Sequence, residues 1–453
     1  MSLESLIDRF AQRAPVATMV RGLMANILSA QELDAIFRDA ATRQYEGDLL
    51  FSSVVELLSL VVTKTQKSLH AAYQTHRQEL GISVRAIYDK LQGIELPVTR
   101  LLVRRTAERM RQVGAALEPD RQPLVPGYEL RIVDGSHLAS TEHRIQETRR
   151  VQGGPLPGQA LVILDPSRGL ILDLLPCADG HAQERSLFVE LADELRPNQL
   201  WIADRNFCTV MLLHEIAVSQ AFFVIRRHGH LPLTPRGPER ACGHCETGEL
   251  FEQEGLVPDG NGNDLPVRII RLRLDKKTED GDGELTLLTN LPKTVKAEAV
   301  AQEYGRRWTI EAAFGELTLS LRGEINTLGY PGAALLGYAI ALVTYNLLSV
   351  CKAAIRVAHP ADEGRHNLSV YYLADEVTGA WRGMEIATDE RQWNDRFAAL
   401  TPRQMAHELR RIAVHAQLRC YRKHPRGPKN KPPPRRNTGP HVATARLIEK
   451  RKK

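Results

Sequence analysis

The chain has 453 residues, of which 43% are hydrophobic and 25% charged, an ordinary composition for a globular protein. This length is too great for one small core, so we expect two to four domains. The formal net charge is +6, but residues 422–453 hold twelve Lys or Arg against Glu449 alone, a local charge of +11. Subtracting that +11 leaves −5 for the rest of the chain, so the basic character lies at one end.

Cysteine usage and the N-terminus both bear on the compartment. The six cysteines are scattered, so a disulfide framework is not expected. Cys242 and Cys245 form a CxxC pair, but no second pair with matching spacing accompanies it, which leaves structural zinc as the less favoured interpretation. The segment MSLESLIDRF has early acids and no apolar run before a cleavage site, unlike a signal peptide. These features predict a cytoplasmic, reducing setting.

Residues 1–125 read as helical and end in a basic segment. The stretch PVTRLLVRRTAERMRQV carries five closely spaced arginines: Arg100, Arg104, Arg105, Arg109 and Arg111. A compact helical region with a basic last helix is typical of DNA-binding modules. The alternative is a scaffold helix with a solvated basic face. We predict a helical N-terminal DNA-binding region over 1–125 and keep the scaffold alternative open.

From residue 126 the pattern changes to strands. YELRIV alternates apolar and polar residues, and QALVILDP and GLILDLLPC, separated by the turn-forming PSRG, predict a hairpin. A helix follows in RSLFVELADELRP, then a buried strand in QLWIADRNF, a helix in TVMLLHEIAVSQ and a strand in AFFVIRRH. The order of three strands, helix, strand, helix, strand predicts an α/β fold with helices on the faces of a mixed sheet.

Residues 229–291 are predicted to form a β-rich insertion. PVRIIRLRLD and GELTLLTNLP read as strong strands, and no helical period of useful length occurs between Gly- and Pro-rich joints. One long helix is expected next, in VKAEAVAQEYGRRWTIEAAFGELTLSLRG. The sheet and this helix are assigned to one catalytic core, over 126–228 and 292–358.

The stretch after Pro331 is long and apolar. No charged residue lies between Glu324 and Lys352, which would suit a transmembrane helix. Its internal polar residues and the lack of a second span favour a buried core helix instead, with no membrane partner. We predict a helical C-terminal region over 359–420 and a basic disordered tail over 421–453. The Pro-rich composition of that tail suits either polyanion binding or a solubilising chain end.

Three carboxylates occupy positions where a metal ligand would be useful. Asp134 and Asp204 end expected strands, and strand ends at the carboxyl edge of a sheet project side chains into a crevice. Glu311 lies one turn after Arg307 and two turns after Tyr304 on the expected helix. Hard oxygen ligands select Mg²⁺ or Mn²⁺. Taken singly, each acid is equally well explained as a turn residue, a helix cap or a salt-bridge partner.

Four segments resemble one family. RIVDGS, LWIADRNF, LLTNLP and YGRRWTIEAAFGELTLSLRG are similar to the DDE transposases of bacterial insertion sequences, and most closely to the insertion-sequence-four (IS four) type. The resemblance runs from about Tyr128 to Val350. It implies a ribonuclease-H-like mixed-sheet core with a β-rich insertion before the last acid, flanked in this chain by the helical N- and C-terminal regions.

The resemblance also assigns roles to residues. It implies that Asp134, Asp204 and Glu311 are the catalytic triad and the ligands of two Mg²⁺ or Mn²⁺ ions. Tyr304 and Arg307 would contact DNA phosphates next to the cut site. The site expected from the resemblance is thus a two-metal phosphodiester-cleaving centre.

The chain departs from the family pattern at two places. The family signature is Tyr-x2-Arg-x3-Glu-x6-Lys, and this chain has Thr318 at the lysine position. Arg322, expected one turn further on the same helix face, is our candidate for a substitute DNA-binding cation. Some relatives cut through a DNA hairpin and hold a flipped base on an insertion-domain tryptophan. The insertion here has none, so Phe222, Phe223 or Phe251 is the candidate to stack instead.

The expected function is DNA transposition. The protein would bind the inverted repeats at the element ends as a homodimer on double-stranded DNA, cleave by hydrolysis, and join the 3′-OH to target DNA. It would work in the bacterial cytoplasm, associated with the nucleoid when bound to DNA. Two alternatives stay open: a DNA-binding protein of transposase descent without cleavage activity, and a metal-dependent DNA nuclease without strand transfer.

Overall fold

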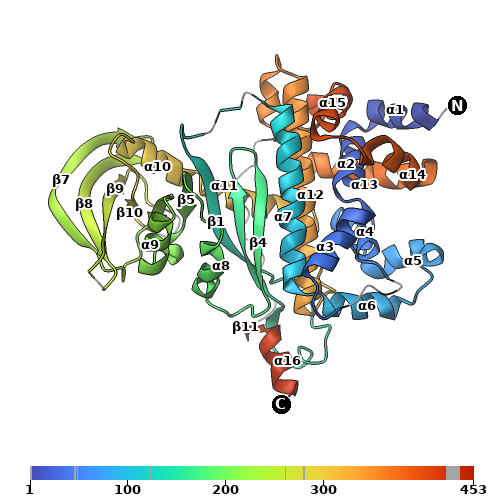
Figure 1. Cartoon of the computed structure of the whole chain (residues 1–453), viewed down its shortest axis with the longest axis horizontal. Coiled ribbons are helices and arrows are strands. Elements are labelled where there is room, and N and C mark those ends of the chain that lie inside the picture. Colours follow the sequence, from blue (N-terminus) through green and yellow to red (C-terminus); the bar gives the residue numbers. More distant parts are fainter. Residues whose placement is uncertain are drawn as a thin grey trace.

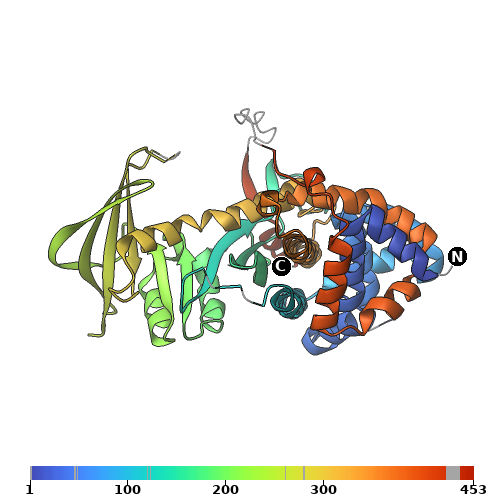
Figure 2. The same cartoon turned by 90° about the horizontal axis from the view of Figure 1, so that it is seen from above.

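The computed structural model describes residues 3–44, 47, 49–119, 121–122, 124–260, 262–278, 281–424 and 439–452. These residues form a mixed α/β protein, with a large sheet at one end and a helical body at the other (Figure 1). The same division is visible from above (Figure 2). The predicted α/β class with a mixed sheet is confirmed.

The sheet has nine strands in the order β4-β3-β1-β5-β6-β10-β9-β8-β7. Strands β1, β3 and β4 are antiparallel neighbours, whereas β5 and β6 run parallel to β1. The predicted hairpin is present as β3 and β4, and Gly169 in its turn has a φ of 66°, which glycine adopts without steric cost. The bounds are β1 Glu129–His137, β3 Gln159–Asp165, β4 Leu170–Cys177, β5 Gln199–Ala203 and β6 Phe222–Arg226.

The β-rich insertion continues this sheet, because its last strand, β10, pairs with β6. The buried Arg268 ties the insertion to the segment that leads into α10 (Ala297–Gly305). Its guanidinium donates to Glu252 Oε1 at 2.6 Å and to the carbonyls of Pro292 and Val295 at 3.0 and 2.8 Å. The insertion strands are β7 Thr234–Cys245, β8 Gly248–Pro258, β9 Asp264–Leu274 and β10 Glu284–Thr289.

The two faces of the sheet bury different helices because neighbouring side chains on a strand point to opposite faces. Val133 and Ala203 pack with residues of α8 (Phe188–Ala192) and α9 (Val210–Val218). Ile132 and Ile202, one position away, belong to the larger cluster that includes α7, α10, α11 and α12. The helix predicted in RSLFVELADELRP is shorter than expected, since only α8, preceded by a 3-10 turn, forms there.

Helices from both ends of the chain build one body. α2 contacts α13 and α15, and the Glu376 carboxylate accepts from the backbone N–H groups of Val16 and Ala17 at 2.7 and 3.1 Å. Helical regions that are separate in sequence therefore share one core. The helices of this body are α1 Leu3–Arg13, α2 Pro15–Ile27, α3 Ala30–Ala40, α4 Phe51–Val62, α5 Leu69–Leu80, α6 Val84–Gly93, α7 Leu96–Leu117, α13 Val370–Ala387, α14 Glu390–Trp393 and α15 Pro402–Ala413.

The arginines of α7 are engaged within the protein. Arg100 donates to Asp173, Glu190 and Glu194, and Arg104 pairs with Glu194. The other three are likewise held, by Asp39, by Glu32 with the Asn26 carbonyl, and by Glu108. α7 itself packs against β4, α12 and α15. For this helix the structure favours the scaffold alternative, while the DNA-binding role of residues 1–125 stays a prediction.

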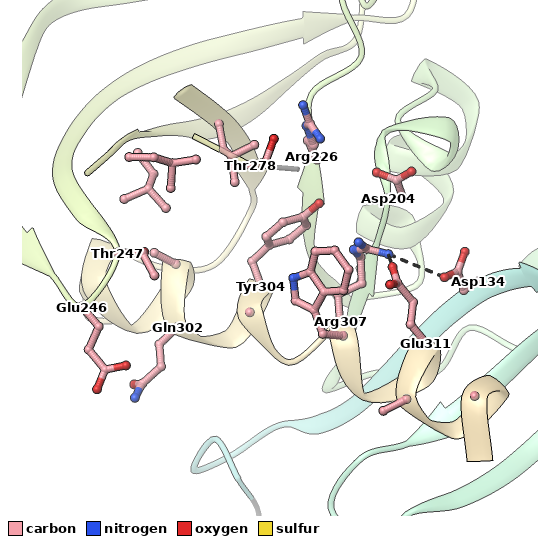
Figure 3. Close-up of a pocket in the computed structure, with 18 of the residues that line it drawn as sticks. Asp134, Asp204, Arg226, Glu246, Thr247, Thr278, Gln302, Tyr304, Arg307 and Glu311 are labelled. Carbon is pink, nitrogen blue, oxygen red and sulfur yellow. Dashed lines mark ion pairs between the residues drawn. The ribbon is translucent and has the colours of Figure 1, made fainter. Parts of the chain in front are cut away.

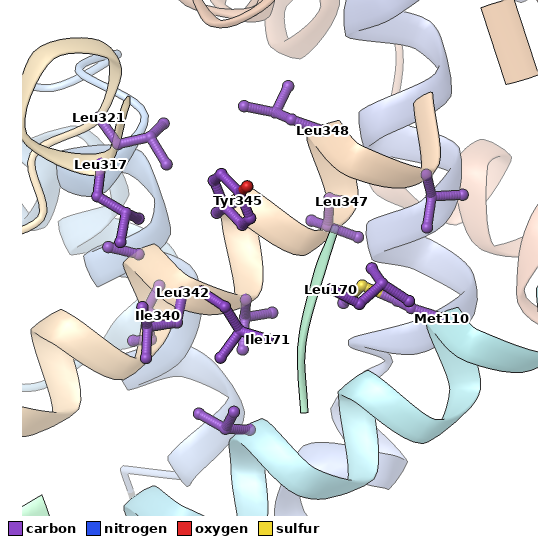
Figure 4. Packing of buried hydrophobic residues seen from close by; sticks show 14 of the residues in the cluster. Met110, Leu170, Ile171, Leu317, Leu321, Ile340, Leu342, Tyr345, Leu347 and Leu348 are labelled. Atoms are coloured by element: carbon purple, nitrogen blue, oxygen red, sulfur yellow. The ribbon is translucent and has the colours of Figure 1, made fainter. Parts of the chain in front are cut away.

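The apolar helix α12 (Pro331–Ala358) is a core helix. It contacts α2, α4, α6, α7, α13, α15 and β4. Of its most apolar stretch of 18 residues, 94% is buried inside the protein. Figure 4 shows Ile340, Leu342 and Leu347 of this helix among Ile171 of β4 and Met110 of α7. The prediction of a buried core helix is confirmed.

The predicted disordered tail is wrong for the residues described at its far end. Gly439–Ala443 forms β11, which pairs in parallel with β2 (Gly153–Leu156), and α16 (Thr444–Lys452) follows. Arg446 and Arg451 in that helix pair with Asp179 at 2.8 Å and Glu147 at 2.6 Å. The strand ladder and the ion pairs hold a segment whose composition predicts no core. Residues 425–438 of the predicted tail lie outside the described residues.

Candidate active site

A cavity of about 2120 Å³ opens beside the carboxyl ends of the central strands (Figure 3). Its walls come from β1, β5, β6, the insertion strands, helices α10 and α11, and residues 369–372 and 423–424. Five of the six predicted site residues line it: Asp134, Asp204, Tyr304, Arg307 and Glu311. Residues more than 170 positions apart in sequence are therefore brought to one cavity.

The two aspartates are level with each other because of strand register. β1 and β5 are parallel neighbours in which Ile132 aligns with Ile202, so Asp134 and Asp204 each lie two residues beyond an aligned pair. Asp134 Oδ1 accepts from Gly135 N at 2.9 Å, and Asp204 Oδ1 accepts from Arg205 N at 2.6 Å. In each aspartate this bond engages Oδ1 and leaves Oδ2 on the side of the cavity, where that of Asp134 lies 3.6 Å from Arg307 Nη1.

The helix expected over 295–323 is divided into two. α10 ends at Gly305 and α11 (Trp308–Ser320) begins three residues later. Between them the backbone tightens, since the N–H groups of Arg306 and Arg307 bond three residues back, to the carbonyls of Glu303 and Tyr304. Two nearly continuous helices carry the three signature residues, and the prediction of one unbroken helix is wrong at this junction.

Arg307 connects two of the three carboxylates. Its Nη1 lies 2.6 Å from Glu311 Oε1 and 3.6 Å from Asp134 Oδ2, as the dashed lines in Figure 3 show. The guanidinium also lies over the Trp308 ring, 4.8 Å from the ring centroid. Its Nε is buried without a hydrogen-bond partner among the described residues. Arg307 occupies the position of a cation between Asp134 and Glu311, with one donor left for a further ligand.

Burial raises the pKa of Asp134 to about 6, against the opposing effects of Arg307 and the Gly135 N–H. The nearby carboxylates of Glu184 and Glu311 raise it further. Burial also raises the pKa of Tyr304 to about 12, so its hydroxyl remains a hydrogen-bond donor at neutral pH. The site therefore combines Asp134, a carboxylic acid with a raised pKa, with Tyr304, a phenol that is neutral at pH 7.

The raised pKa of Asp134 predicts a pH-dependent stability difference between the wild type and the variant Asp134→Asn, both free of metal. Below the ordinary pKa of 3.8 the carboxyl is protonated in both folded and unfolded states. As pH rises to about 6, the unfolded chain ionises first, so Asp134 lowers the stability of the wild type. We expect Asp134→Asn to be more stable by roughly 2 kcal/mol at pH 7 but not at pH 3.5.

Denaturant unfolding at the two pH values measures that difference. Asp173→Asn is unsuitable as a control because Arg100 binds that carboxylate, whereas Glu298→Gln changes an exposed acid of the same cavity. Glu298→Gln should show no pH-dependent gain. An Asp134→Asn advantage that is equal at both pH values would contradict the raised pKa.

The donor chemistry of the site fits a hard divalent cation, but the carboxylates are not drawn together. Among the described residues, no group of three or more His, Cys, Asp or Glu side chains is close enough to hold a metal ion. Asp134, Asp204 and Glu311 nonetheless present oxygen ligands to one cavity, as Mg²⁺ or Mn²⁺ requires. Movement of Arg307 away from Asp134 and Glu311 would free both carboxylates.

The replacement expected for the signature lysine is wrong in its placement. α11 ends at Ser320, so Arg322 does not continue its face. Its side chain donates to the Lys67 carbonyl on the loop after α4, and its backbone N–H donates to the carbonyl of Val62, the last residue of α4. Thr318 points its hydroxyl back to the Phe314 carbonyl at 3.0 Å. Neither Thr318 nor Arg322 lines the cavity.

The phenylalanines proposed for base stacking are engaged elsewhere. Phe223 is fully buried, and Phe222 packs edge-on against Tyr128 with ring centroids 4.9 Å apart. Arg271 and Arg273 lie over the Phe251 ring. None of the three lines the cavity, so the stacking role predicted for them is wrong in this structure.

Several residues of the cavity were not predicted. Trp308 is 61% exposed and lines the cavity. Arg226 ends β6, parallel to β5, and pairs with Asp282 at 2.6 Å. The strand-end rule that found Asp204 applies equally to Arg226. Tyr371 and Tyr372 at the start of α13, and Lys423 and His424 further along the chain, also line the cavity, and local sequence pattern did not predict them.

The CxxC pair does not form a metal centre in the described residues. Cys242 is exposed and its thiol lies near the Arg240 carbonyl, whereas Cys245 lines the cavity beside Thr247. His244 pairs with Asp275 at 3.3 Å.

Comparison with known proteins bears on the segment that carries this cavity. Residues 125–347, just under half of the chain, match the family model of the transposase DDE domain. The segment is therefore similar to a transposase DDE domain. It contains β1 to β10, α10 and α11, and with them Asp134, Asp204 and Glu311. This supports the DDE transposase resemblance, without distinguishing the insertion-sequence-four type from its relatives.

Solved structures and curated proteins provide two further comparisons. Among solved structures, piggyBac transposase in a synaptic complex with hairpin DNA is similar at 12% identity and a TM-score of 0.43, over 87% of this chain and 85% of that chain. No curated protein matches the chain.

Proposed function

We propose that this protein is a DNA transposase whose transposase DDE domain cleaves and joins DNA. One observation carries the proposal: the parallel register of β1 and β5 puts Asp134 and Asp204 level at one sheet edge, and α11 presents Glu311 to the same cavity. An acid from each of three separated segments meets there. If each acid had only a local structural role, the three side chains would not need to lie at one cavity.

The charge of the cavity supports a divalent metal in the proposed reaction. Seven Asp or Glu side chains line it against five Lys or Arg. A DNA strand would be repelled by that excess of negative charge unless cations neutralised it. Two Mg²⁺ or Mn²⁺ ions would do so and would supply activation of a water or 3′-hydroxyl and stabilisation of the leaving oxygen. In this proposal Asp134, Asp204 and Glu311 hold the ions.

The chain's other groups act on the DNA in this proposal. With Asp134 and Glu311 serving as metal ligands, the guanidinium of Arg307 would no longer be held by them and would pair with a phosphate. The Tyr304 hydroxyl, kept neutral by its raised pKa, donates to a second phosphate oxygen. Trp308, beside Arg307 and well exposed, excludes water from one side of the reacting strand.

We also propose that the core is ribonuclease-H-like and of the insertion-sequence-four type. The five-strand order β4-β3-β1-β5-β6, with three antiparallel strands followed by two parallel ones, supports that assignment. The substrate would be the element's inverted repeats in double-stranded DNA, recognised by a homodimer in the bacterial cytoplasm and at the nucleoid. The helical region of residues 1–125 is proposed to bind the ends.

The neutral side chain at the signature position favours one alternative. Thr318 has no charge and Arg322 is held on another loop, so neither residue supplies the expected lysine charge to the cavity. That arrangement is compatible with a DNA-binding protein of transposase descent that no longer cuts. A metal-dependent nuclease without strand transfer would share the same carboxylates.

Supercoiled DNA carrying the element's ends separates these functions. With Mg²⁺ and a target plasmid, a transposase nicks at the ends and yields joined products. Nicking without joining identifies the nuclease. Binding to the ends without nicking, in either Mg²⁺ or Mn²⁺, would overturn the enzymatic proposal.

A further inference from the structure

A second, smaller pocket lies apart from the catalytic cavity, between the β3–β4 turn and the C-terminal half of α12. Its volume is about 150 Å³. Four cationic side chains line it, together with the hydroxyl groups of Tyr345 and Ser349: Arg121, Arg168, Lys352 and Arg356. Such a density of positive charge in a small concave site is unlike the mixed charge of the larger cavity.

The fold holds these cations in place. Tyr345, Ser349, Lys352 and Arg356 recur at steps of three and four along α12, so they share one face of the helix. Arg168 is set by the β3–β4 turn, where the buried carboxylate of Asp165 accepts from the N–H of Ser167 at 2.8 Å and pairs with Arg168 at 3.5 Å. The pocket is therefore built on rigid elements.

The pocket has more positive than negative charge. Glu118 pairs with both Arg121, at 2.5 Å, and Arg356, at 3.4 Å. Asp165 pairs with Arg168. Lys352 makes no hydrogen bond or ion pair with any described residue, so two carboxylates face four cations and two positive charges remain.

Lys352 is the cation of this pocket whose charge a bound anion would stabilise most. Burial lowers its pKa, and the repulsion of Lys423 and Arg356 adds to this effect, while Glu316 opposes it. A half-buried cation without a close partner costs stability in the free protein. An anion in the pocket would recover that cost on binding.

We propose that this pocket is a binding site for a single phosphate group. A volume of about 150 Å³ equals the share of roughly five liquid waters, enough for a tetrahedral anion, and three guanidinium groups and one ammonium group line it. The phosphate is either a phosphodiester of bound DNA or a free phosphate ion. The DNA source rests on the proposed function and gains support from position, since Glu316 and Lys423, which act on Lys352, line the catalytic cavity.

The test uses the full chain and the variants Lys352→Met and Arg168→Gln. Lys352→Met keeps the length of the side chain and removes a poorly solvated charge, so it should fold. The matched control is Arg85→Gln, which removes one exposed charge from α6, near the opposite end of α12. Inorganic phosphate binding is followed by calorimetry and by thermal shift against chloride at equal ionic strength. Binding of a duplex oligonucleotide without metal is followed across salt concentrations.

We expect both pocket variants, but not Arg85→Gln, to lose about tenfold or more in affinity for phosphate. If DNA supplies the phosphate, the slope of log affinity against log salt for the duplex falls by about 1 in the same variants. Loss of phosphate binding with an unchanged DNA slope assigns the pocket to free phosphate. Wild-type behaviour of both variants in both arms would overturn the proposal. The phosphate arm requires neither DNA binding nor cleavage, so it can succeed even where the transposase proposal fails.

Discussion

Glu311→Gln should abolish metal-dependent DNA cleavage while leaving DNA binding intact. The substitution keeps the shape of the side chain but removes the charge that pairs with Arg307 at 2.6 Å and, in the proposed function, binds a metal ion. Loss of one ligand of a metal that stabilises phosphoryl transfer is worth several kcal/mol, so the rate should fall on the order of 10³-fold or more. Single-turnover cleavage of DNA carrying the element's ends measures the effect.

Glu298→Gln is the charge-matched control for that experiment. Glu298 lies in the first turn of α10 and lines the same cavity. It is exposed, and it lies on a different element from Asp134, Asp204 and Glu311. Its variant should cleave at close to the wild-type rate. Wild-type cleavage by Glu311→Gln would remove Glu311 from the triad. Loss of end binding together with cleavage would point instead to damage of the α11 surface.

Asn346→Leu should be among the most destabilising single changes in the chain. Asn346 is fully buried on α12, and its amide oxygen accepts from Ile171 N while its Nδ2 donates to Ile171 O, each at 2.7 Å. Those two bonds pair the backbone N–H and C=O of Ile171 in β4, the edge strand of the sheet. Figure 4 shows Ile171 among residues of α12. Leucine would leave both Ile171 groups buried and unpaired, at a cost of about 3 kcal/mol.

Thr344→Val provides the comparison on the same helix. Thr344 is also buried, but its hydroxyl bonds only to the Ile340 carbonyl of its own helix, at 2.8 Å. That carbonyl already belongs to the helical ladder, so the loss should stay below about 1 kcal/mol. Unfolding in denaturant, followed by circular dichroism, gives both values. Equal losses for the two variants would show that Asn346 does not anchor β4.

Local patterns accounted for much of the sheet and part of the site. The alternation in YELRIV and the PSRG turn predicted β1 and the β3–β4 hairpin because strand periodicity and turn chemistry are properties of adjacent residues. The strand-end rule placed Asp204 directly after β5, as the structure has it, but it was wrong for Asp134, because β1 continues past that residue to His137. The two acids are level because β1 and β5 are parallel and in register. Arg226 followed the same rule but was not predicted, although it ends the next parallel strand.

Predictions that depended on partners distant in sequence fared less well. The arginines of α7 read as a DNA-binding face, but several of their carboxylate partners come from α3, β4 and α8, which periodicity does not reveal. The tail residues Gly439–Ala443 lack an apolar core pattern, yet β2 supplies the ladder that orders them. Arg322 was placed on a helix face that ends two residues earlier.

The sequence by itself determined that Asp134 and Asp204 belong to two strand segments and Glu311 to a helix, because those settings follow from local periodicity and family resemblance. Only the tertiary structure decided that they share a cavity, since the parallel register of β1 and β5 and the packing of α11 against β1 are long-range contacts. It also decided that Arg307 lies between two of the acids and that Arg168 and Lys352 meet in a second pocket. Charge clusters of this kind depend on distances through space, which spacing along the chain does not fix.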